Sequence, residues 1–572
     1  MFSRIYKPFL LLCILGVAVA CYLPGMSNHF IFDDGVNIAK NPYIQIEHLN
    51  PASLWQAAAS GNAGPLKRPL SMLSFALDYY VSGLSASHFK MTNLGIHLVN
   101  GMLVFILCGL LLNLYHRIHR IASDDDASFW IAAAISAIWL LHPFSLTGVL
   151  YVVQRMTSLS ALFTLAGLVL YLYGRKRLLD GNRSGFIAVA ASIFVATPLA
   201  ALSKENGALL PLLILLMEIT LLRWRAPDQT TRRILVTIVG LTAVVPVLAG
   251  MFYIWHNPGL ISGGYLIRDF SLTERLMTEA RVLWFYMHMI LLPNMAMMGL
   301  HHDDILISKS LFSPLSTAPS IVGLLLLAAG AFVLRNKHPL IAFGAAFFLM
   351  GHVLESSVFP LEIAFEHRNY LPMLGILLPL AYYILNPQFH PSSLRLRRAS
   401  FLMLIILFAS LTASRAQQWG DPLQMRMLEV QRHPHSVRAN TDMAALYHNL
   451  PARTPDEALD FYTRAIFHYQ QAAESSPTNT SGLFGMLVVN AERGMPVSST
   501  LIDTLEGKLA TVPFNPPNVN AMVGTARCIK SGKCSVSPEI VDRLYRAALS
   551  NPTLTGVYRS HVVSEFSALR QN

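Results

Sequence analysis

Two adjacent carboxylates, Asp33 and Asp34, are well suited to acid–base chemistry because they follow an aromatic, apolar stretch beyond the first apolar segment. Partial burial raises the pKa of a carboxyl group toward that of a general base, and a like-charged neighbour adds to the effect. Gly35, the next residue, allows the backbone to turn sharply. The pair therefore predicts a catalytic base, with a helix N-cap or a solvated acidic turn as the alternative interpretation.

A second group of candidates is basic, and its members lie near acids or aromatic residues. Arg368 belongs to the segment 355–370, which is dense in glutamates and aromatic side chains. Guanidinium groups match phosphate oxygens, so a phosphate is the expected guest. The alternative is internal pairing of these cations with neighbouring glutamates. Further polar candidates expected on the outer side are Arg68, His142, Arg155, Lys204, Glu205, Glu366, His367 and Tyr370.

His301, His302 and Asp303 could ligate a divalent metal, although adjacent histidines rarely point at one ion. A divalent metal is therefore a possible cofactor, and no other cofactor is indicated. The sequence contains no Walker loop, no H-E-x-x-H and no G-x-S-x-G pattern. This argues against ATP-driven transport, zinc proteolysis and hydrolase chemistry of the familiar kinds.

The composition indicates that most of the elements that position these candidate residues lie in a lipid bilayer. Of the 572 residues, 53% are hydrophobic and 13% are charged, against roughly 25% charged in soluble domains. The mean hydropathy is +0.45. The formal net charge of +11 arises from basic residues in short loops between apolar runs, which is typical of orienting loops in a bilayer. We therefore expect no nucleic-acid partner.

Eleven apolar segments are long enough to be read as membrane spans. The loops rich in arginine and lysine alternate along the chain, and all share the side of Arg4 and Lys7. The positive-inside rule then predicts a cytoplasmic N-terminus on a retained anchor, and an odd number of spans puts the C-terminal tail outside. Residues 276–300 are predicted to be re-entrant or interfacial on the outer side. The predicted spans are 8–23, 91–114, 128–146, 150–173, 185–203, 207–222, 234–255, 319–334, 339–354, 371–386 and 400–414.

The fold class is thus all-α and polytopic, with residues 1–414 as the transmembrane catalytic domain and 24–88 as its first periplasmic loop. The tail, 415–572, has a soluble composition with amphipathic helical patterns punctuated by prolines. It is predicted to be a periplasmic helical domain, either of tetratricopeptide type or irregular, that offers a surface to a partner chain. Cys528 and Cys534 flank a turn-prone stretch, and an outer location makes a disulfide between them reasonable.

Several short motifs in this order resemble the GT-C class of membrane glycosyltransferases, closest to bacterial relatives of the transmembrane-and-tetratricopeptide O-mannosyltransferases. The motifs are Phe32-Asp33-Asp34, Leu141-His142-Pro143, the segment 153–163 around Gln154-Arg155-Met156, Ser203-Lys204-Glu205 and Glu366-His367-Arg368-Asn369-Tyr370. The resemblance implies a polyprenyl-phosphate sugar donor with its phosphate at the outer rim and, normally, inversion at the anomeric carbon. It also implies a base in the first outer loop, Asp33 or Asp34 with a slight preference for Asp34, and phosphate contacts from Arg155, Lys204, Arg368 and, more weakly, Arg68.

The sequence thus predicts a bacterial inner-membrane enzyme that transfers a sugar to a hydroxyl of a periplasmic or exported protein, such as a pilin, docked on the tail. Membrane lipid is its other partner. One alternative is transfer to a surface polysaccharide or lipid, and another is a non-enzymatic scaffold or transporter. The enzymatic interpretation requires the distant acids and guanidinium groups to converge in one outer pocket at the edge of the bilayer.

Overall fold

The computed structural model describes residues 2–122, 124–389 and 391–570, and within them every regular element is a helix. Each of the eleven predicted spans is helical. They are α1 (Phe2–Tyr22), α4 (Ala86–His119), α5 (Asp125–Leu140), α7 (Arg155–Leu179), α8 (Gly185–Ala191) continued by α9 (Thr197–Ser203), α10 (Leu210–Met217), α11 (Gln229–His256), α14 (Thr317–Leu334), α15 (Pro339–Gly351), α16 (Leu374–Leu385) and α17 (Leu394–Gly420). The all-α polytopic fold class is confirmed.

Length and apolar composition alone qualify eight of the helical segments among the described residues as membrane spans. A ninth is the pair formed by α5 and Pro143–Leu150, which is bent by 53° at His142. The helices α15 and α16 are apolar but shorter. With 13 and 12 residues, both fall short of the roughly 20 that a span requires, so these two of the eleven spans stay predictions.

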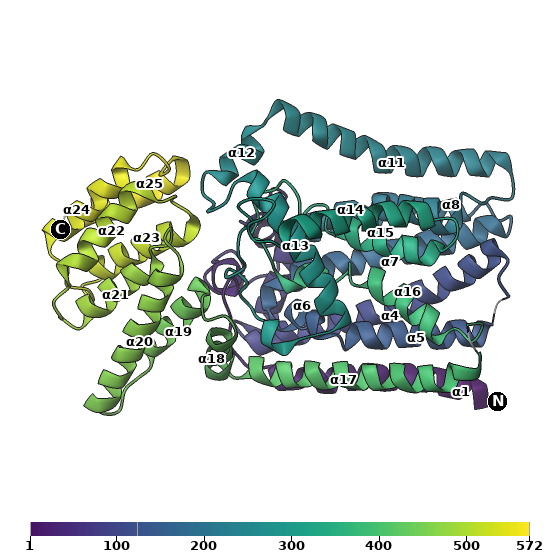
Figure 1. Ribbon diagram of the computed structural model, residues 1–572, viewed down its shortest axis with the longest axis horizontal. Coiled ribbons are helices and arrows are strands. Elements are labelled where there is room, and N and C mark those ends of the chain that lie inside the picture. Colours follow the sequence, from purple (N-terminus) through teal and green to yellow (C-terminus); the bar gives the residue numbers. More distant parts are fainter. Residues whose placement is uncertain (1, 123, 390, 571–572) are drawn as a thin grey trace.

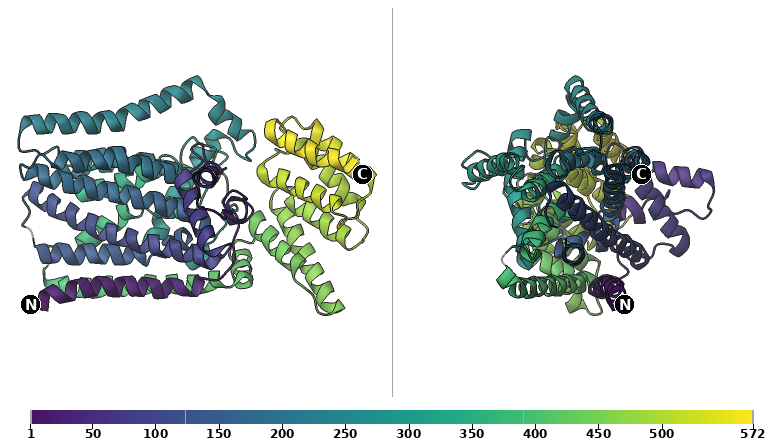
Figure 2. Two further views of the ribbon diagram at one scale, coloured as in Figure 1. Left: turned by 180° about the vertical axis from the view of Figure 1, so that it is seen from behind. Right: turned by 90° about the vertical axis from the view of Figure 1, so that its right-hand side faces the viewer.

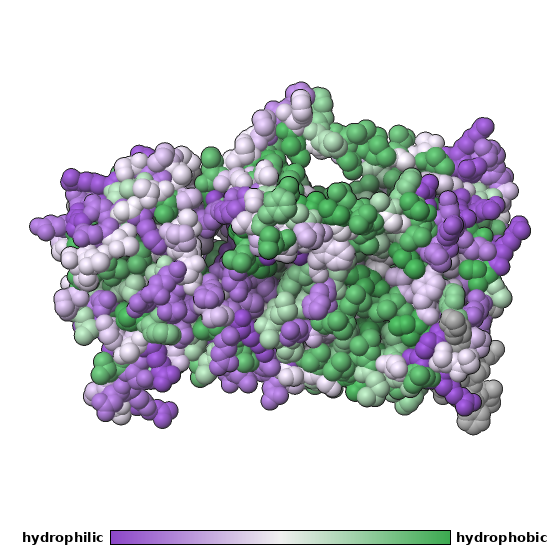
Figure 3. Space-filling view, in the orientation of Figure 1, coloured by the Kyte–Doolittle hydropathy of each residue, from purple (hydrophilic) through white to green (hydrophobic). Residues whose placement is uncertain are grey.

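The basic loops meet at one end of this bundle, as the charge pattern predicts. Lys7 pairs with Asp126 at 2.6 Å and Arg117 with Asp180 at 2.5 Å, while Arg223 donates to the carbonyl of Asn336. Figures 1 and 2 show the N-terminus at this end and the tail at the opposite end. In Figure 3 a hydrophobic band lies between the two hydrophilic ends, which is the surface expected of a protein that crosses a bilayer.

Five further helices gather at the end near the tail, around the loops and short turns that carry the candidate site. They are α2 (Pro51–Ala59), α3 (Pro69–Ser82), α6 (Thr147–Leu150), α12 (Gly259–Tyr265) and α13 (Leu272–Leu291). The two ends of α13 both contact this end of the bundle. Arg275 donates to the carbonyl of Glu355 (2.7 Å), and the carbonyl of Ile290 bonds His142 (3.0 Å). Both ends of the helix therefore contact the same end of the bundle, and its re-entrant or interfacial position stays a prediction.

The tail consists of eight further helices: α18 (Pro422–Arg432), α19 (Val437–Asn449), α20 (Pro455–Ser475), α21 (Ser481–Glu492), α22 (Ser499–Thr511), α23 (Pro516–Lys530), α24 (Pro538–Ser550) and α25 (Gly556–Arg570). Several begin with a proline preceded by a capping side chain, as at Asp421, Thr454, Asn515 and Ser537. These residues satisfy the free N–H groups of a first turn. Helix α17 continues to Gly420, so the tail helices start later than residue 415.

A hydrophobic core of its own holds the second half of the tail, with Leu487, Leu505, Leu509 and Met522 at its centre. The predicted disulfide between Cys528 and Cys534 is present, with 5.3 Å between the two Cα atoms. Neighbouring helices such as α19 and α20, and α20 and α21, pack together in sequence. Tetratricopeptide repeats stay a prediction.

The two ends of the molecule give a topology test. Cysteines introduced at two exposed serine and threonine positions, Ser184→Cys in the α7–α8 loop and Thr500→Cys in α22, should face opposite sides of the membrane. In spheroplasts, an impermeant maleimide should label Thr500→Cys and should reach Ser184→Cys only after permeabilisation. Labelling of both cysteines in intact spheroplasts would contradict the arrangement.

Candidate functional site

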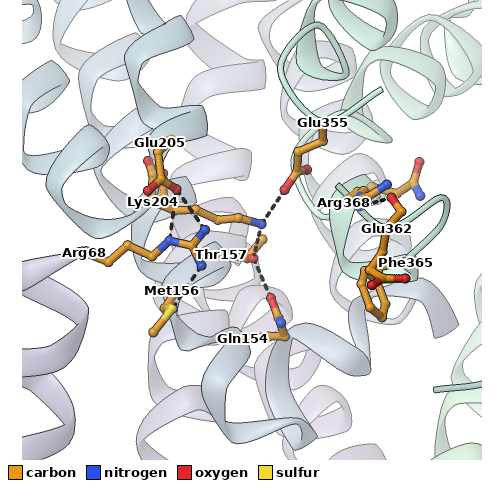
Figure 4. A network of polar contacts seen from close by, with 12 residues as sticks. Arg68, Gln154, Met156, Thr157, Lys204, Glu205, Glu355, Glu362, Phe365 and Arg368 are labelled. Atoms are coloured by element: carbon orange, nitrogen blue, oxygen red, sulfur yellow. Dashed lines mark hydrogen bonds and ion pairs between the residues drawn. The ribbon is translucent and has the colours of Figure 1, made fainter. Parts of the chain in front are cut away.

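A small cavity of about 40 Å³ at the tail end of the bundle brings together two of the predicted phosphate ligands, Lys204 and Arg368. We call it the cationic cavity. Its wall is formed by the first turns of α7, by η6 (Glu205–Leu209) with the residue before it, and by the segment that follows α15. Figure 4 shows Lys204 reaching in from one side and the segment with Glu355 and Arg368 lying on the other.

Lys204 stands between two helical segments with an extended backbone, and this directs its long side chain into the cavity. Its ammonium contacts a carboxylate oxygen of Glu355 at 2.7 Å and donates to the hydroxyl of Thr157 at 3.1 Å. Burial alone would raise the pKa of Glu355, but the charges of Lys204 and Arg368 outweigh it and lower that pKa well below its usual value. Glu355 is therefore ionised, and it occupies the cavity as an anion.

Arg368 retains hydrogen-bonding capacity although it is only 5% exposed. Its guanidinium donates to the carbonyls of Ile363 (2.9 Å) and Glu362 (2.7 Å). An arginine has five N–H donors, so about three make no hydrogen bond among the described residues, although the guanidinium also lies 4.0 Å from the Glu279 carboxylate. Lys204 likewise uses two of its three N–H donors, for Glu355 and Thr157. Unspent donors on two cations beside one cavity are what an anionic ligand requires.

Arg68 lies beside this cavity and is held by Glu205, with Nη2 to Oε2 at 2.9 Å. Lys67 and Arg68 both have left-handed backbones, with φ of 57° and 51°, directly before the proline that starts α3. Such a conformation costs roughly 1–2 kcal/mol per non-glycine residue. The strain is maintained by the surrounding contacts and keeps Arg68 close to Lys204, as Figure 4 shows. The alternative pairing of Lys204 with Glu205 is not found; Glu205 pairs with Arg68.

Arg155 has a different environment from the one expected of a phosphate ligand. It is fully buried and donates to the Asp78 carboxylate (2.5 Å), the Asn93 side chain (2.6 Å) and the carbonyls of Ser74 and Phe89. Four of its five donors are thus spent on the protein itself. The arginine connects α3, α4 and α7, and we do not carry it forward as a ligand of phosphate.

Asp33 opens onto a second and much larger space, a cleft of about 840 Å³ between the first outer loop and the tail. We call it the interdomain cleft. Burial raises the pKa of Asp33 above its usual value, while hydrogen bonding from the Tyr151 hydroxyl and the charge of Arg438 lower it in part. The preceding residue, Phe32, has a left-handed backbone with φ of 43°, which fixes the direction of the turn that presents Asp33.

Asp34 is turned away from the cleft and is fully buried. Its two carboxylate oxygens accept from the backbone N–H groups of Ile31 (3.0 Å) and Val153 (2.7 Å). Burial raises its pKa to about 7 against the lowering effect of these bonds. Asp34 therefore anchors the acidic turn to the segment before α7, and of the two acids Asp33 is the one with access to a ligand.

The predicted single pocket is divided into two adjacent spaces by the segment 362–368. Phe365 lines the interdomain cleft, and its ring centroid lies 5.5 Å from the guanidinium carbon of Arg368, which lines the cationic cavity. Glu362 also lines the cleft, and its carbonyl accepts from Arg368. The acid and the cations therefore face a common wall from opposite sides.

The remaining polar candidates hold this wall in place. Glu366 is buried, pairs with Arg415 of α17 at 2.7 Å and accepts from the N–H of Gly299. The His367 ring stacks on Phe365, with 5.1 Å between centroids. The Tyr370 hydroxyl bonds His97 (2.7 Å) and accepts from Asn100, while His142 bonds the carbonyl of Ile290. All four side chains are buried, and their polar or ring contacts lie within the protein.

Two further arginines, which were not among the predicted site residues, complete the wall. Arg275 of α13 is fully buried and donates to the carbonyls of Glu355, Ser357 and Leu361. Arg438 of α19 pairs with Glu362 at 2.9 Å and lies 5.3 Å from the Phe32 ring centroid. No local pattern identifies either residue, because their partners are far away in the sequence.

The three candidate metal ligands do not converge on one point. His301 contacts Asp442 (3.1 Å), His302 faces Glu366 (3.7 Å), and Asp303 accepts from Ser436 (2.5 Å). Within the described ranges, the one group with metal-ligand spacing is Glu492 with the disulfide cysteines. The predicted metal set is therefore wrong as a site, and His301 and Asp303 instead attach the tail to the membrane helices.

The geometry defines a polytopic membrane protein with a small cavity lined by Lys204 and Arg368 beside a cleft that carries the carboxylate of Asp33. Comparison with known proteins agrees with this class. The chain is 28% identical over 199 residues to the human protein O-mannosyl-transferase TMTC3 and 29% identical over 222 residues to human TMTC4. A Caenorhabditis elegans protein O-mannosyl-transferase, F38B6.6, is 24% identical over 203 residues.

These matches make the chain a relative of the TMTC-type O-mannosyltransferases over about a third of its length. They cover 34–36% of this chain and only 20–28% of the relatives. No protein-family model matches the sequence, and no solved structure matches it significantly. The resemblance found in the motifs is thereby confirmed.

The environment of Arg155 predicts a structural phenotype. Arg155→Met leaves Asp78 and Asn93 without their buried partner, and loss of one member of a buried pair costs about 3–5 kcal/mol. We expect that loss in the free energy of unfolding, measured by denaturant titration in detergent micelles. The matched control, Arg117→Met, removes an exposed ion pair and should cost no more than about 1 kcal/mol. If Arg155→Met left the free energy of unfolding unchanged but abolished binding of the sugar donor, Arg155 would be a phosphate ligand after all.

Proposed function

We propose that this protein is a membrane glycosyltransferase that moves a sugar from a polyprenyl-phosphate donor to a hydroxyl group of a protein. The observation that carries the proposal is the adjacency of the Asp33 cleft to a cavity in which Lys204 and Arg368 have unspent donors. The names of the relatives, protein O-mannosyl-transferases, support the reaction class and make mannose the first sugar to test.

The cationic cavity suits the phosphate of the donor. Lys204 is held by Glu355, so an entering phosphate competes with this carboxylate for the ammonium. Since the cavity is only about 40 Å³ and the segment 362–368 separates it from Asp33, Glu355 and this segment must move outward as the phosphate enters, so that the sugar reaches the cleft. Arg368 then contributes a planar set of donors that matches two phosphate oxygens, and Arg68 lies close enough to add charge.

The chemistry requires one proton transfer and one displacement. Asp33, as its carboxylate, takes the proton of the acceptor hydroxyl while the hydroxyl oxygen attacks the anomeric carbon. The bond from that carbon to the phosphate oxygen breaks, and the electron pair leaves with the lipid phosphate. Lys204 and Arg368 stabilise the charge that develops on this leaving group. Attack from the side opposite the phosphate inverts the anomeric carbon.

The proposed setting is a bacterial inner membrane with the tail in the periplasm. The acceptor is then an exported protein, such as a pilin, that docks on the tail. Support for this setting comes from the basic loops at one end of the bundle and from the disulfide at the other.

Replacement of each acid separates the two roles. Asp33→Asn keeps the size of the side chain but removes the base, so we expect transfer to fall about 10²- to 10⁴-fold without loss of folded protein. Asp34→Asn introduces an amide in place of an acceptor oxygen at the N–H groups of Ile31 and Val153, so it should lower stability as well. The measurement is the intact mass of exported proteins from cells that lack the gene and carry each variant. If the Asp33→Asn variant glycosylated the exported proteins fully, Asp33 would not be the catalytic base.

The pH dependence gives a separate test. Only the ionised form of Asp33 accepts a proton, so kcat/KM falls as the pH is lowered through the pKa of Asp33. Because burial raises that pKa, the acid limb should lie above the value of about 4 that is usual for aspartate. Tyr151→Phe removes a hydrogen bond that lowers the pKa of Asp33, so it should move the acid limb to higher pH. An acid limb that stays in place contradicts the assignment.

A further inference from the structure

The interdomain cleft extends well beyond Asp33, and its far wall belongs to the tail. The near wall contains Asp33, Phe32 and Phe365, while helices α19, α21 and α23 form the opposite wall. Its volume of about 840 Å³ is within the range of roughly 300–1,000 Å³ that is usual for ligand pockets. A single hydroxyl group beside Asp33 fills a small part of this space, so the remainder is available to whatever carries the hydroxyl.

The far wall has a mixed lining. Val437, Val488, Pro516 and Pro517 contribute side chains with no hydrogen-bonding groups, whereas polar side chains lie between them. These polar residues include Thr441, Asp442, Asn479, Ser481, Asn520 and Thr525. A groove of this kind suits a polypeptide in extended form, because apolar side chains fit its apolar parts while the polar groups reach the backbone.

A glycan fits the apolar part of this lining poorly. A sugar chain presents hydroxyl groups along its whole length, and those facing valine and proline would lose hydrogen bonds to water without replacement. A folded protein surface fits poorly for a different reason. Asp33 lies between the tail and the membrane helices, and Arg438 and Glu362 join the two sides beside it with an ion pair of 2.9 Å.

One position on the far wall has room for a side chain that the sequence does not supply. Gly524 lies on an exposed part of α23 that lines the cleft, and a Cβ atom built on it meets no other atom within 4 Å. Its φ is not left-handed, so the backbone does not require glycine there. Gly524 therefore leaves space for a ligand in the cleft. The amide of Asn520, one helical turn earlier, lies beside this space.

Building on the proposed function, we propose that the interdomain cleft binds the acceptor as an extended, unfolded segment. The segment runs between α19, α21 and α23 of the tail and the turn at Phe32, and it delivers a serine or threonine hydroxyl to Asp33. The acceptor is therefore modified before it folds or in a disordered region. Asn520 bonds its backbone, so the groove accepts many sequences.

The test fills the groove without touching Asp33. Gly524→Trp places a bulky ring in the cleft, and Gly507→Trp places the same ring on an exposed part of α22, where a Cβ also meets nothing within 4 Å and which does not line the cleft. The probes are an unstructured peptide of about 20 residues of Ser, Thr, Ala and Pro and a blocked Ala-Ser-Ala tripeptide. The donor is undecaprenyl-phosphate mannose, and the reconstituted full chain is the enzyme.

We expect Gly524→Trp to raise the KM for the long peptide by about 10-fold or more, with kcat/KM for the tripeptide unchanged. Gly507→Trp should match the wild type with both probes. If Gly524→Trp does not fold, Asn520→Ala replaces it and should raise the long-peptide KM by about 2- to 10-fold.

The outcomes separate this inference from the proposed function. If the wild type transfers mannose to neither probe, the proposed function fails. If the wild type is active and Gly524→Trp equals it with the long peptide, or loses both probes alike, the extended-segment groove is wrong. Competition by a soluble oligosaccharide of about six hexoses, with none by unglycosylatable Ala-Pro peptide, would assign the cleft to a glycan instead.

Discussion

The arrangement of the site depends on one constraint: the segment 355–369 carries two buried glutamates, Glu355 and Glu366, and the partly exposed Glu362, and all three pair with cations. Glu355 takes Lys204, Glu366 takes Arg415, and Glu362 takes both Arg268 and Arg438. The cations come from four distant parts of the chain. Removal of one partner leaves an uncompensated buried charge, at a cost of several kcal/mol, so these pairs fix the membrane helices, the segment around Arg268 and the tail around one loop.

This loop gives the molecule its two working spaces. On one side its backbone carbonyls orient Arg368 beside Lys204, and on the other Phe365 and Glu362 face Asp33 across the interdomain cleft. The tail is held at a set distance by contacts from His301 and Asp303 to α19 and its cap. The ion pairs that hold the domains together therefore also position the Asp33 carboxylate and the cations proposed to bind the phosphate. In the proposed mechanism the lipid-linked donor approaches from the membrane and the acceptor from the aqueous side.

Much of the fold could be predicted from the sequence because hydropathy and loop charge are local properties. All eleven segments, the shared end of the basic loops and the disulfide follow from them. Within the site, Lys204 and Arg368 were predicted to lie together and do so. The role of Arg155 was missed because its partners Asp78 and Asn93 lie on two other helices. Likewise, the choice between Asp33 and Asp34 depends on the N–H groups of Ile31 and Val153, and sequence spacing does not reveal these contacts.

The proposed mechanism places the phosphate of a lipid-linked sugar in the cationic cavity, across the segment 362–368 from Asp33. A cryo-electron microscopy structure of the full chain with undecaprenyl-phosphate tests it most directly. The account predicts phosphate density at hydrogen-bond distance, about 3 Å, from Lys204 Nζ and the Arg368 guanidinium, with Glu355 displaced from its present contact with Lys204. A phosphate bound elsewhere, with the Lys204–Glu355 pair intact, would contradict it.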